Sequence, residues 1–303
     1  MKPFTSMLAL LLIVSGCGAA EAPRKLKVLT SILPAYCLAA GVAGDRAVVE
    51  NLLPPGVGPH DYSLSVRDRR KFDQADVIIL NGLGLESWLD RVIKASANNP
   101  KRAVVRLADG VTNLITTVPT LDLGHGHAHE HEHGDANPHI WLDPQLAAHG
   151  VTNILRALQQ ADPANAAAYA TNAQALVKRL QTLDAEIARV LASLKDREIV
   201  TYHDAFPYFA RRYGLKVLGV VETVPEVNPS PKYLSQLSQV IREHRVPVIF
   251  TEAGFPTKLA QRLRDELKIA IAPLDTLESG PLQPAAYEEG LRRNLETLKQ
   301  HLR

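Results

Sequence analysis

The sequence predicts an α/β protein built from two similar lobes, each with a mainly parallel sheet, that are joined by one long helix. Three observations lead to this prediction. Short apolar runs alternate with amphipathic segments in the first half of the 303 residues, the same alternation returns in the second half, and one long amphipathic segment separates the halves. Strands that alternate with helices favour parallel pairing, because each crossover returns the chain to the same end of the sheet.

The first set of alternating elements defines an N-terminal lobe over residues 24–160. The expected strands cover residues 26–32, 48–53 and 77–80, and the expected helices cover residues 34–42, 65–74 and 86–97. The segment Pro54–Tyr62 is too rich in proline and glycine for either element, so His60 lies on a rigid loop that leaves a strand. Gly82 and Gly84 suit a tight strand-to-helix turn, and without a third glycine they do not make a dinucleotide-binding loop.

A long helix is expected over residues 161–196, between the lobes. Asp162 is a good N-cap, Pro163 suits the first helical turn, and apolar residues then recur at spacings of three and four up to Leu194. At 1.5 Å per residue the apolar stripe is about 48 Å long, which is enough to bridge two lobes. The alternatives are a two-helix hairpin and a coiled coil between molecules.

The alternation of strands and helices resumes in a C-terminal lobe over residues 197–303. The expected strands cover residues 198–202, 216–220, 246–251 and 269–274, and the expected helices cover residues 205–213, 232–243, 257–267 and 284–301. The same architecture is therefore expected on each side of the long helix.

The first 23 residues resemble an export signal and are excluded from the lobes. The apolar run Met7–Val14 follows a basic residue and is too short to span a bilayer about 30 Å thick. The run ends in Val14-Ser15-Gly16-Cys17, which resembles a bacterial lipobox, so we expect cleavage before Cys17 and attachment of lipid to its thiol. The alternative is ordinary signal cleavage a few residues later, which would discard Cys17.

The charge balance bears on the expected partners, and the cysteine content bears on the role of Cys37. The chain has 34 basic and 32 acidic residues, a formal charge of +2, and no basic stripe with interleaved aromatic residues. Nucleic acid is therefore not an expected partner. If Cys17 is acylated, Cys37 has no cysteine to pair with, and we expect it to be a small buried hydrophobic residue.

A histidine-rich loop is expected over residues 124–136. It contains His125, His127, His129, His131 and His133. These residues alternate with Gly, Ala and Glu, which cannot bury a core, so the loop is expected to be solvated and to collect metal ions as an accessory site; a neutral insertion is the alternative. The match of residues 129–133 to the zinc-protease pattern H-E-x-x-H carries no weight, because that pattern needs a helix.

Four further residues are candidates for a metal site. In open α/β sheets ligands bind at the carboxyl ends of the strands, and His60, His203 and Asp275 each follow an expected strand. His139 lies between the strands of the first lobe and the long helix. Three imidazoles and a carboxylate suit tetrahedral Zn²⁺, although spacing alone does not establish that the four residues meet. Glu222 and Glu252, also at strand ends, compete with Asp275.

Five segments carry a resemblance to a known family. They are Gly58-Pro59-His60-Asp61-Tyr62, Asn81-Gly82-Leu83-Gly84-Leu85-Glu86, Asn137-Pro138-His139-Ile140-Trp141-Leu142-Asp143-Pro144, His203-Asp204-Ala205-Phe206, and Pro229-Ser230-Pro231 before a helix. They occur in the family's order over nearly all of the mature chain. The sequence resembles the metal-binding solute-binding proteins of bacterial ABC importers, in the zinc and manganese subgroup that includes proteins of the ZnuA and TroA type.

The resemblance implies two α/β lobes joined by one long helix, with one metal ion in the cleft between them. Its ligand positions fall on His60, His139, His203 and Asp275. Histidine at the third of these positions favours zinc, because the family's manganese binders tend to have a carboxylate there. Thr276 and Leu277 follow Asp275 where the family often has glycine, so water or Glu222 stays an alternative as the fourth ligand.

The resemblance also implies a function and a location. The expected function is capture of Zn²⁺ outside the inner membrane and its delivery to a transmembrane permease that works with a cytoplasmic ATPase. The chain would be a monomer, periplasmic or at the cell surface, and anchored to the membrane through acylated Cys17. Mn²⁺ or another divalent ion is the alternative cargo, and a metal buffer, an adhesin or a zinc hydrolase are the alternative classes. Four protein ligands would close the zinc shell, so we expect carriage rather than catalysis.

Overall fold

The computed structural model describes residues 24–60, 62–96, 102–116, 136–222, 229–252 and 258–302. The export segment with Cys17 and the histidine-rich residues 125–133 lie outside the described residues. Within the described ranges, no helix is both long enough and apolar enough to cross a membrane.

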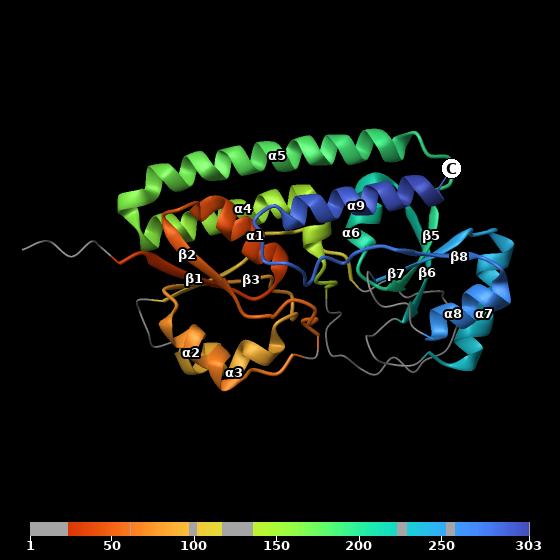
Figure 1. The fold of residues 1–303 in the computed structure, drawn as a ribbon, viewed down its shortest axis with the longest axis horizontal. Helices are drawn as coiled ribbons and strands as arrows, with labels where there is room; N and C mark the ends of the chain where they lie inside the picture. Colours follow the sequence, from red (N-terminus) through yellow and green to blue (C-terminus); the bar gives the residue numbers. More distant parts are fainter. Residues whose placement is uncertain are drawn as a thin grey trace, which may run out of the picture.

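Two four-stranded parallel sheets form the framework, one in each lobe (Figure 1). The N-terminal sheet has the order β2-β1-β3-β4 and consists of β1 (Leu26–Thr30), β2 (Ala47–Asn51), β3 (Val77–Leu80) and β4 (Ala103–Arg106). The C-terminal sheet has the order β6-β5-β7-β8 and consists of β5 (Glu198–His203), β6 (Lys216–Glu222), β7 (Val248–Thr251) and β8 (Ala270–Pro273). Each lobe places its first strand between its second and third, so both halves of the chain share one topology. The predicted fold class is confirmed.

The helices lie between and around these strands (Figure 1). In the first half they are α1 (Leu33–Ala43), α2 (Val66–Gln74), α3 (Asp90–Ser96) and α4 (Pro144–Ala161). After them come α5 (Ala166–Ala192), α6 (Pro207–Tyr213), α7 (Pro231–Glu243), α8 (Lys258–Leu267) and α9 (Ala286–His301). Short 3₁₀ turns cover Ser87–Leu89, Ile140–Leu142 and Pro163–Asn165.

The sequence prediction does not include two of these elements, β4 and α4. β4 has four residues, all half-buried, so its sequence pattern is weak. The signals for α4 are present in the sequence: the Asp143 side chain caps the helix by accepting from the Gln145 backbone N–H at 2.8 Å, and a proline follows Asp143 at the first helical position. Val151, Ile154 and Leu158, at spacings of three and four, are fully buried.

The long helix α5 lies along both lobes (Figure 1). Its 27 residues make it about 40 Å long. It is shorter than the predicted range 161–196, because the turn Pro163–Asn165 separates it from α4 and the chain turns toward β5 after Ala192. The predicted apolar stripe is buried and includes Tyr169, Ala173, Leu176, Leu180, Leu183 and Ile187. Through this stripe α5 packs against α1, α4 and α9.

One hydrophobic core runs through both lobes, from Val28 of β1 to Phe250 of β7. Trp141, fully buried, connects the two halves near the middle of this core. Its indole N–H donates to the carbonyl of Thr276 at 2.8 Å, and its own carbonyl accepts from the Tyr287 hydroxyl at 2.5 Å. A wide hinge opening between the lobes would expose this shared core, so the packing holds the lobes at a nearly constant orientation.

Asp184 interrupts the apolar stripe of α5 with a buried carboxylate. It accepts hydrogen bonds from Arg212 of α6 at 2.8 and 2.5 Å, from Gln145 of α4 at 2.8 Å and from the Tyr213 hydroxyl at 3.0 Å. Burial alone would raise the pKa of this carboxyl, but these donors hold the pKa below its usual value. The network ties α5 to helices of both lobes.

Replacing Asp184 with alanine should destabilise the protein, because it leaves the donors of Arg212, Gln145 and the buried Tyr213 without their shared acceptor. We expect the free energy of unfolding to fall by about 1.5–3 kcal/mol, the magnitude for hydrogen bonds to a charged group. Urea denaturation measures this change. Asp45→Ala is the control, since the Asp45 side chain is 82% exposed and pairs with the adjacent Arg46. Equal effects of the two substitutions would contradict a structural role for the Asp184 network.

Candidate metal site

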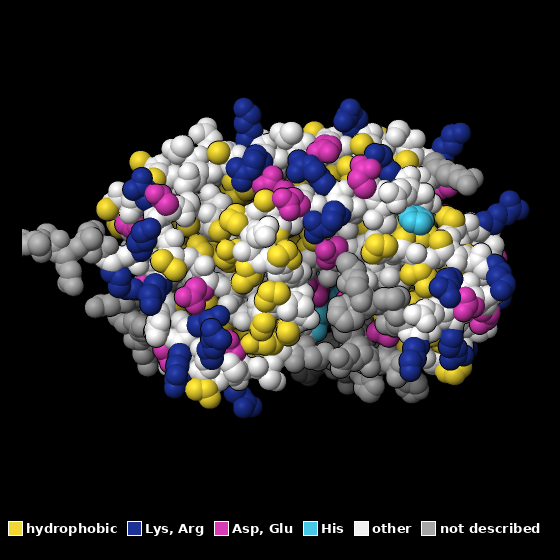
Figure 2. Space-filling model, in the orientation of Figure 1, with side chains coloured by type: hydrophobic (Ala, Val, Ile, Leu, Met, Phe, Trp, Pro, Cys, Tyr) yellow, Lys and Arg dark blue, Asp and Glu magenta, His cyan; other side chains and the backbone are white. Residues whose placement is uncertain are grey.

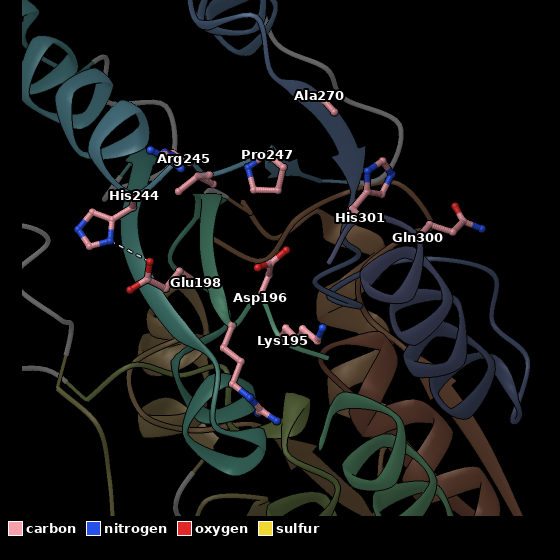
Figure 3. A pocket seen from close by; sticks show the side chains of 11 residues that line it. Lys195, Asp196, Glu198, His244, Arg245, Pro247, Ala270, Gln300 and His301 are labelled. Carbon is pink, nitrogen blue, oxygen red and sulfur yellow. Dashed lines mark hydrogen bonds and ion pairs between the residues drawn. The ribbon is translucent and has the colours of Figure 1, made fainter. Parts of the chain in front are cut away.

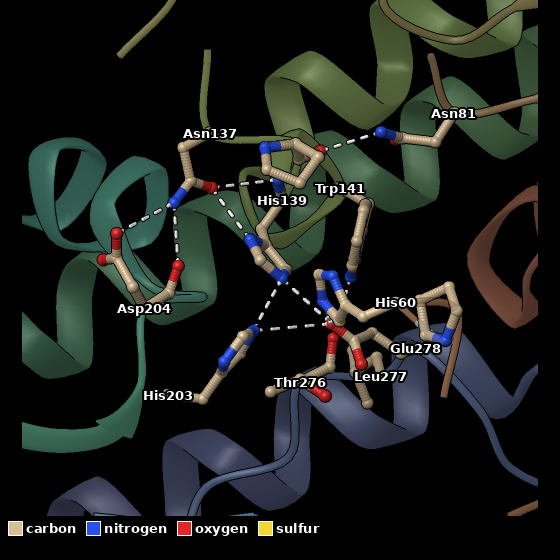
Figure 4. Close-up of polar contacts among 12 residues, drawn as sticks. His60, Asn81, Asn137, His139, Trp141, His203, Asp204, Thr276, Leu277 and Glu278 are labelled. Atoms are coloured by element: carbon tan, nitrogen blue, oxygen red, sulfur yellow. Dashed lines mark hydrogen bonds and ion pairs between the residues drawn. The ribbon is translucent and has the colours of Figure 1, made fainter. Parts of the chain in front are cut away.

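Four side chains from both halves of the chain converge between the lobes (Figure 4). They are His60, His139, His203 and Glu278, and one ligand atom from each lies within 4.8 Å of all the others. Nε2 of His139 is 2.9 Å from Oε1 of Glu278 and 3.1 Å from Nε2 of His203, and Nε2 of His60 is 3.1 Å from the same carboxylate oxygen. Donors placed roughly 2.0–2.1 Å from a tetrahedral zinc ion lie about 3.3 Å apart. The group therefore has the size needed to surround one small cation.

These side chains lie in loops or at the ends of secondary-structure elements. His60 lies on the loop between β2 and α2, and His139 directly precedes the 3₁₀ turn that leads into α4. His203 is the last residue of β5, and Glu278 lies on the loop between β8 and α9. The structure thus brings together His60, His139 and His203, three of the four side chains that the sequence indicates for the site.

Burial distinguishes the inner members of the group from the outer one. His139, His203 and Glu278 are buried, whereas the side chain of His60 is 26% exposed. Histidine surface is visible in the groove between the two halves of the molecule in Figure 2. Of the four side chains, that of His60 is therefore the most exposed to solvent.

Hydrogen bonds to the backbone hold the loops that carry these side chains. The Trp88 indole N–H donates to the carbonyl of Pro59 at 2.9 Å and so anchors the loop of His60. The Leu33 backbone N–H donates to the carbonyl of Glu278 at 3.3 Å, while Trp141 lies against the His139 ring and bonds to the Thr276 carbonyl. These contacts position the ligand atoms before any ion binds.

The structure does not bring Asp275 into this group. Its carboxylate accepts from the Leu277 backbone N–H at 2.9 Å and lies 3.8 Å from the guanidinium of Arg293. Leu277 adopts a left-handed backbone conformation, with φ of 60°, and its side chain packs against Gly290. This turn carries the chain back toward the cleft, so Glu278, three residues further on, supplies the carboxylate expected of Asp275. The rule that ligands bind at the carboxyl ends of strands selects the first acidic residue after β8. It takes no account of the turn at Leu277.

The two other acidic candidates also lie outside the group. Glu222 accepts a short hydrogen bond from the Tyr202 hydroxyl. Glu252 is nearby, and burial together with the negative charge of Glu278 raises its pKa to about 7. Neither residue is in the four-membered cluster found among the described residues.

The cluster concentrates electron pairs at one point. Burial lowers the pKa of His139 and lowers that of His203 to about 3, so both rings are neutral at neutral pH. Burial would raise the pKa of Glu278, but the imidazoles of His139 and His60 lower it, and the group is an ionised carboxylate. Neutral imidazole nitrogens and a carboxylate are the forms that bind metal ions.

A second cavity, of about 750 Å³, lies at the opposite, amino-terminal edge of the C-terminal sheet (Figure 3). Three of the charged or polar side chains that line it, Arg197, Glu198 and His244, have partners. Glu198 accepts from Lys216 and lies 2.8 Å from the ring of His244, and Arg197 donates to the carbonyls of Leu191 and Tyr213. This cavity is not part of the candidate metal site.

Cys37 is buried, as predicted, and takes no part in the metal site. Its thiol donates to the carbonyl of Gln283 at 3.3 Å, and burial raises its pKa to about 12. The proposed lipid-bearing Cys17 and the five histidines of the loop, His125 to His133, lie outside the described residues.

An α/β protein with two parallel-sheet lobes and a compact imidazole and carboxylate cluster between them belongs to the class of metal-binding solute-binding proteins. The comparison with protein families agrees: the family described as the periplasmic component A of the zinc-uptake complex, ZnuA, matches residues 28–301. The chain belongs to this family, which confirms the resemblance seen in the sequence.

Individual relatives bind different metals. The iron-binding protein YfeA of Yersinia pestis is 33% identical over 248 residues, 81% of this chain and 75% of YfeA. The zinc-binding lipoprotein AdcA of Streptococcus pneumoniae is 29% identical over 307 residues, which cover 99% of this chain but only 61% of AdcA.

Solved structures show the same variety. A Zn(II)-bound variant of AdcAII from Streptococcus pneumoniae has a TM-score of 0.79 and 30% identity, covering 92% of this chain and 99% of that chain. FpvC of Pseudomonas aeruginosa in complex with Mn²⁺ has a TM-score of 0.78 and 31% identity, covering 92% and 98% of the two chains. Family membership thus establishes the class of protein, and the identity of its metal has to be argued from the site.

The choice between Glu278 and Asp275 as the carboxylate ligand can be tested directly. Glu278→Gln removes the charge that faces the three imidazoles, so zinc affinity should fall by at least about 10- to 100-fold, the range found for weaker, outer-shell changes. Asp275→Asn, the matched control, should leave affinity within a few-fold of the wild type. Competition with a fluorescent zinc chelator measures both, and the opposite ranking would restore Asp275 as the ligand.

The buried imidazoles should also make the metal-free protein sensitive to acid. Unfolded histidine has a pKa of about 6.5, whereas folding lowers the pKa of His139 and His203, so below that pH the unfolded state binds more protons. The free energy of unfolding should therefore fall as the pH drops from about 7 to 5, by up to about 1.4 kcal/mol per pH unit for each ring. Urea denaturation with chelator present measures the slope. His203→Gln should reduce it, and an unchanged slope would contradict the assignment.

Proposed function

We propose that this chain is the zinc-binding, extracytoplasmic component of an ABC-type importer, which captures Zn²⁺ and delivers it to a transmembrane permease with a cytoplasmic ATPase. The observation that carries the proposal is the convergence of His60, His139, His203 and Glu278 on a volume the size of one tetrahedral ion. In this reading zinc is the cargo of the protein.

The donor set supports zinc over manganese. Three imidazole nitrogens are borderline-soft ligands, and sites of this kind bind Zn²⁺ more tightly than Mn²⁺ in the general order of divalent ions. Mn²⁺ prefers carboxylate and other oxygen ligands in octahedral sites, whereas this cluster offers one carboxylate. Relatives named for iron and manganese binding make the metal preference a question to be settled by titration of this protein.

Carriage is favoured over catalysis by the number of protein ligands. A catalytic zinc ion keeps a position open for water, usually beside a general base. Here four protein side chains would complete a tetrahedral shell. The half-buried His60 is the ligand nearest the opening and is therefore the first that an ion would meet on entry and the last that it would leave.

The remaining assignments concern the location of the protein. We place the mature chain outside the inner membrane, in the periplasm or at the cell surface, as a monomer anchored through acylated Cys17. The lipobox-like sequence before Cys17 and the similarity to AdcA, which is named a zinc-binding lipoprotein, support the anchor. The histidine-rich loop is proposed as an accessory element that collects zinc near the cleft.

Calorimetric titration of the protein without residues 1–23, with zinc and with manganese, tests this proposal. We expect one tight zinc site that manganese does not displace, and we expect that site to survive deletion of residues 125–133. His139→Ala should abolish tight binding, whereas His149→Ala, at a ring that contacts the Asp109 carbonyl instead, should not. Loss of the tight site on loop deletion would assign metal binding to the loop, and tighter manganese binding would overturn the zinc assignment.

A further inference from the structure

Asn137, two residues earlier in the chain, contacts the ring nitrogen of His139 that points away from the cluster (Figure 4). Oδ1 of Asn137 lies 2.9 Å from Nδ1 of the His139 ring and also accepts the His139 backbone N–H at 3.0 Å. At the other end of the amide, Nδ2 of Asn137 donates to the carbonyl of Asp204 at 2.7 Å and contacts its carboxylate at 3.3 Å. Asn137 is only 2% exposed, so water does not compete for these bonds.

The two ends of this amide cannot be exchanged. The backbone N–H of His139 can only donate, and the backbone carbonyl of Asp204 can only accept. The oxygen of the Asn137 amide must therefore face His139, and its NH₂ group must face Asp204. Because an amide oxygen has no proton to give, Nδ1 of the His139 ring must carry one.

The position of that proton decides what the ring can bind. With Nδ1 protonated, the neutral ring has its lone pair on Nε2, the atom that faces Glu278 and His203. The other tautomer would point an N–H bond into the metal position, where it would donate to Oε1 of Glu278, and would oppose two lone pairs 2.9 Å apart at Asn137. The buried Asn137 amide thus opposes the effect of Glu278 and favours the tautomer that can ligate a cation.

The same amide connects ligands that come from different halves of the chain. Asp204 directly follows His203, so Asn137 links the segment that carries His139 to the turn that carries His203. The Asn137 backbone is itself fixed, since its N–H donates to the Ile115 carbonyl at 2.7 Å and its carbonyl accepts from the Tyr208 hydroxyl at 2.8 Å.

We propose that Asn137 is a positioning residue of the metal site: its side chain fixes the tautomer of His139 and keeps the His139 and His203 imidazoles in register before the ion arrives. This inference rests on the proposed function in one respect, which is the identity of the ion that binds. Outer partners of this kind typically change metal affinity by about 10- to 100-fold when they are removed.

The tautomer of His139 separates the two possible roles of Asn137. If Asn137 only stabilised the fold, its removal would not change which nitrogen of His139 carries the proton. Long-range ¹⁵N–¹H correlation spectra of the metal-free protein at neutral pH should show His139 protonated at Nδ1. Asn137→Ala should allow the Nε2-protonated form to appear and should weaken zinc binding by about 10- to 100-fold. Asn137→Asp keeps an acceptor beside Nδ1 but sets a carboxylate against the carbonyl and carboxylate of Asp204, so it should retain the Nδ1 tautomer while lowering the melting temperature.

Asn153→Ala is the matched control, because it removes another asparagine amide, one that donates to the carbonyls of Arg106, Leu107 and Asp109 and does not contact the cluster. It should keep the wild-type tautomer and zinc affinity. A wild-type tautomer or affinity in Asn137→Ala, or an equal affinity loss in Asn153→Ala, would overturn the proposal. If the wild-type protein showed no tight zinc site, the proposed function would fail, while the tautomer measurement on the metal-free protein would still decide the role of Asn137.

Discussion

Three imidazole nitrogens and one carboxylate oxygen are held within 4.8 Å of one another at a largely buried position, which brings four metal-binding atoms together at one point. The rest of the structure serves to impose this arrangement. Each ligand atom comes from a different loop or strand end, and each of those segments is bonded to a neighbouring element. The scaffold thus holds the four ligand atoms close together.

The duplicated topology explains how two distant parts of the chain reach one point. In both lobes the first strand is central, and the carboxyl ends of the parallel strands face the cleft. The first lobe contributes His60 and, before α4, His139, and the second lobe contributes His203 and Glu278. Asn137 then connects the two contributions through Asp204.

The long helix and the continuous core limit how the site can open. α5 packs against α1, α4 and α9, and the buried Asp184 bonds to side chains of α4 and α6. Trp141 and Tyr287 add bonds across the same region. Because a large rotation of the lobes would break this packing, exchange of the ion is expected to depend on the partly exposed His60 and its loop rather than on a wide hinge.

The sequence by itself determined the alternation of strands and helices, the doubled α/β plan and three of the four clustered side chains, because hydrophobic periodicity and strand ends are local properties. His60 and His203 were visible as polar residues that follow expected strands, and the family motif around His139 singled out that residue. The existence of α4 was also encoded locally, in Asp143, Pro144 and the buried stripe that follows.

Only the tertiary structure decided which carboxylate completes the group. Asp275 and Glu278 lie three residues apart on one loop, and the choice between them depends on the left-handed turn at Leu277 and on how its side chain packs against Gly290 of α9. The tautomer of His139 depends likewise on a contact between Asn137 and Asp204, which are 67 positions apart. Such contacts arise from the packing of distant segments, and no local pattern of residues specifies them.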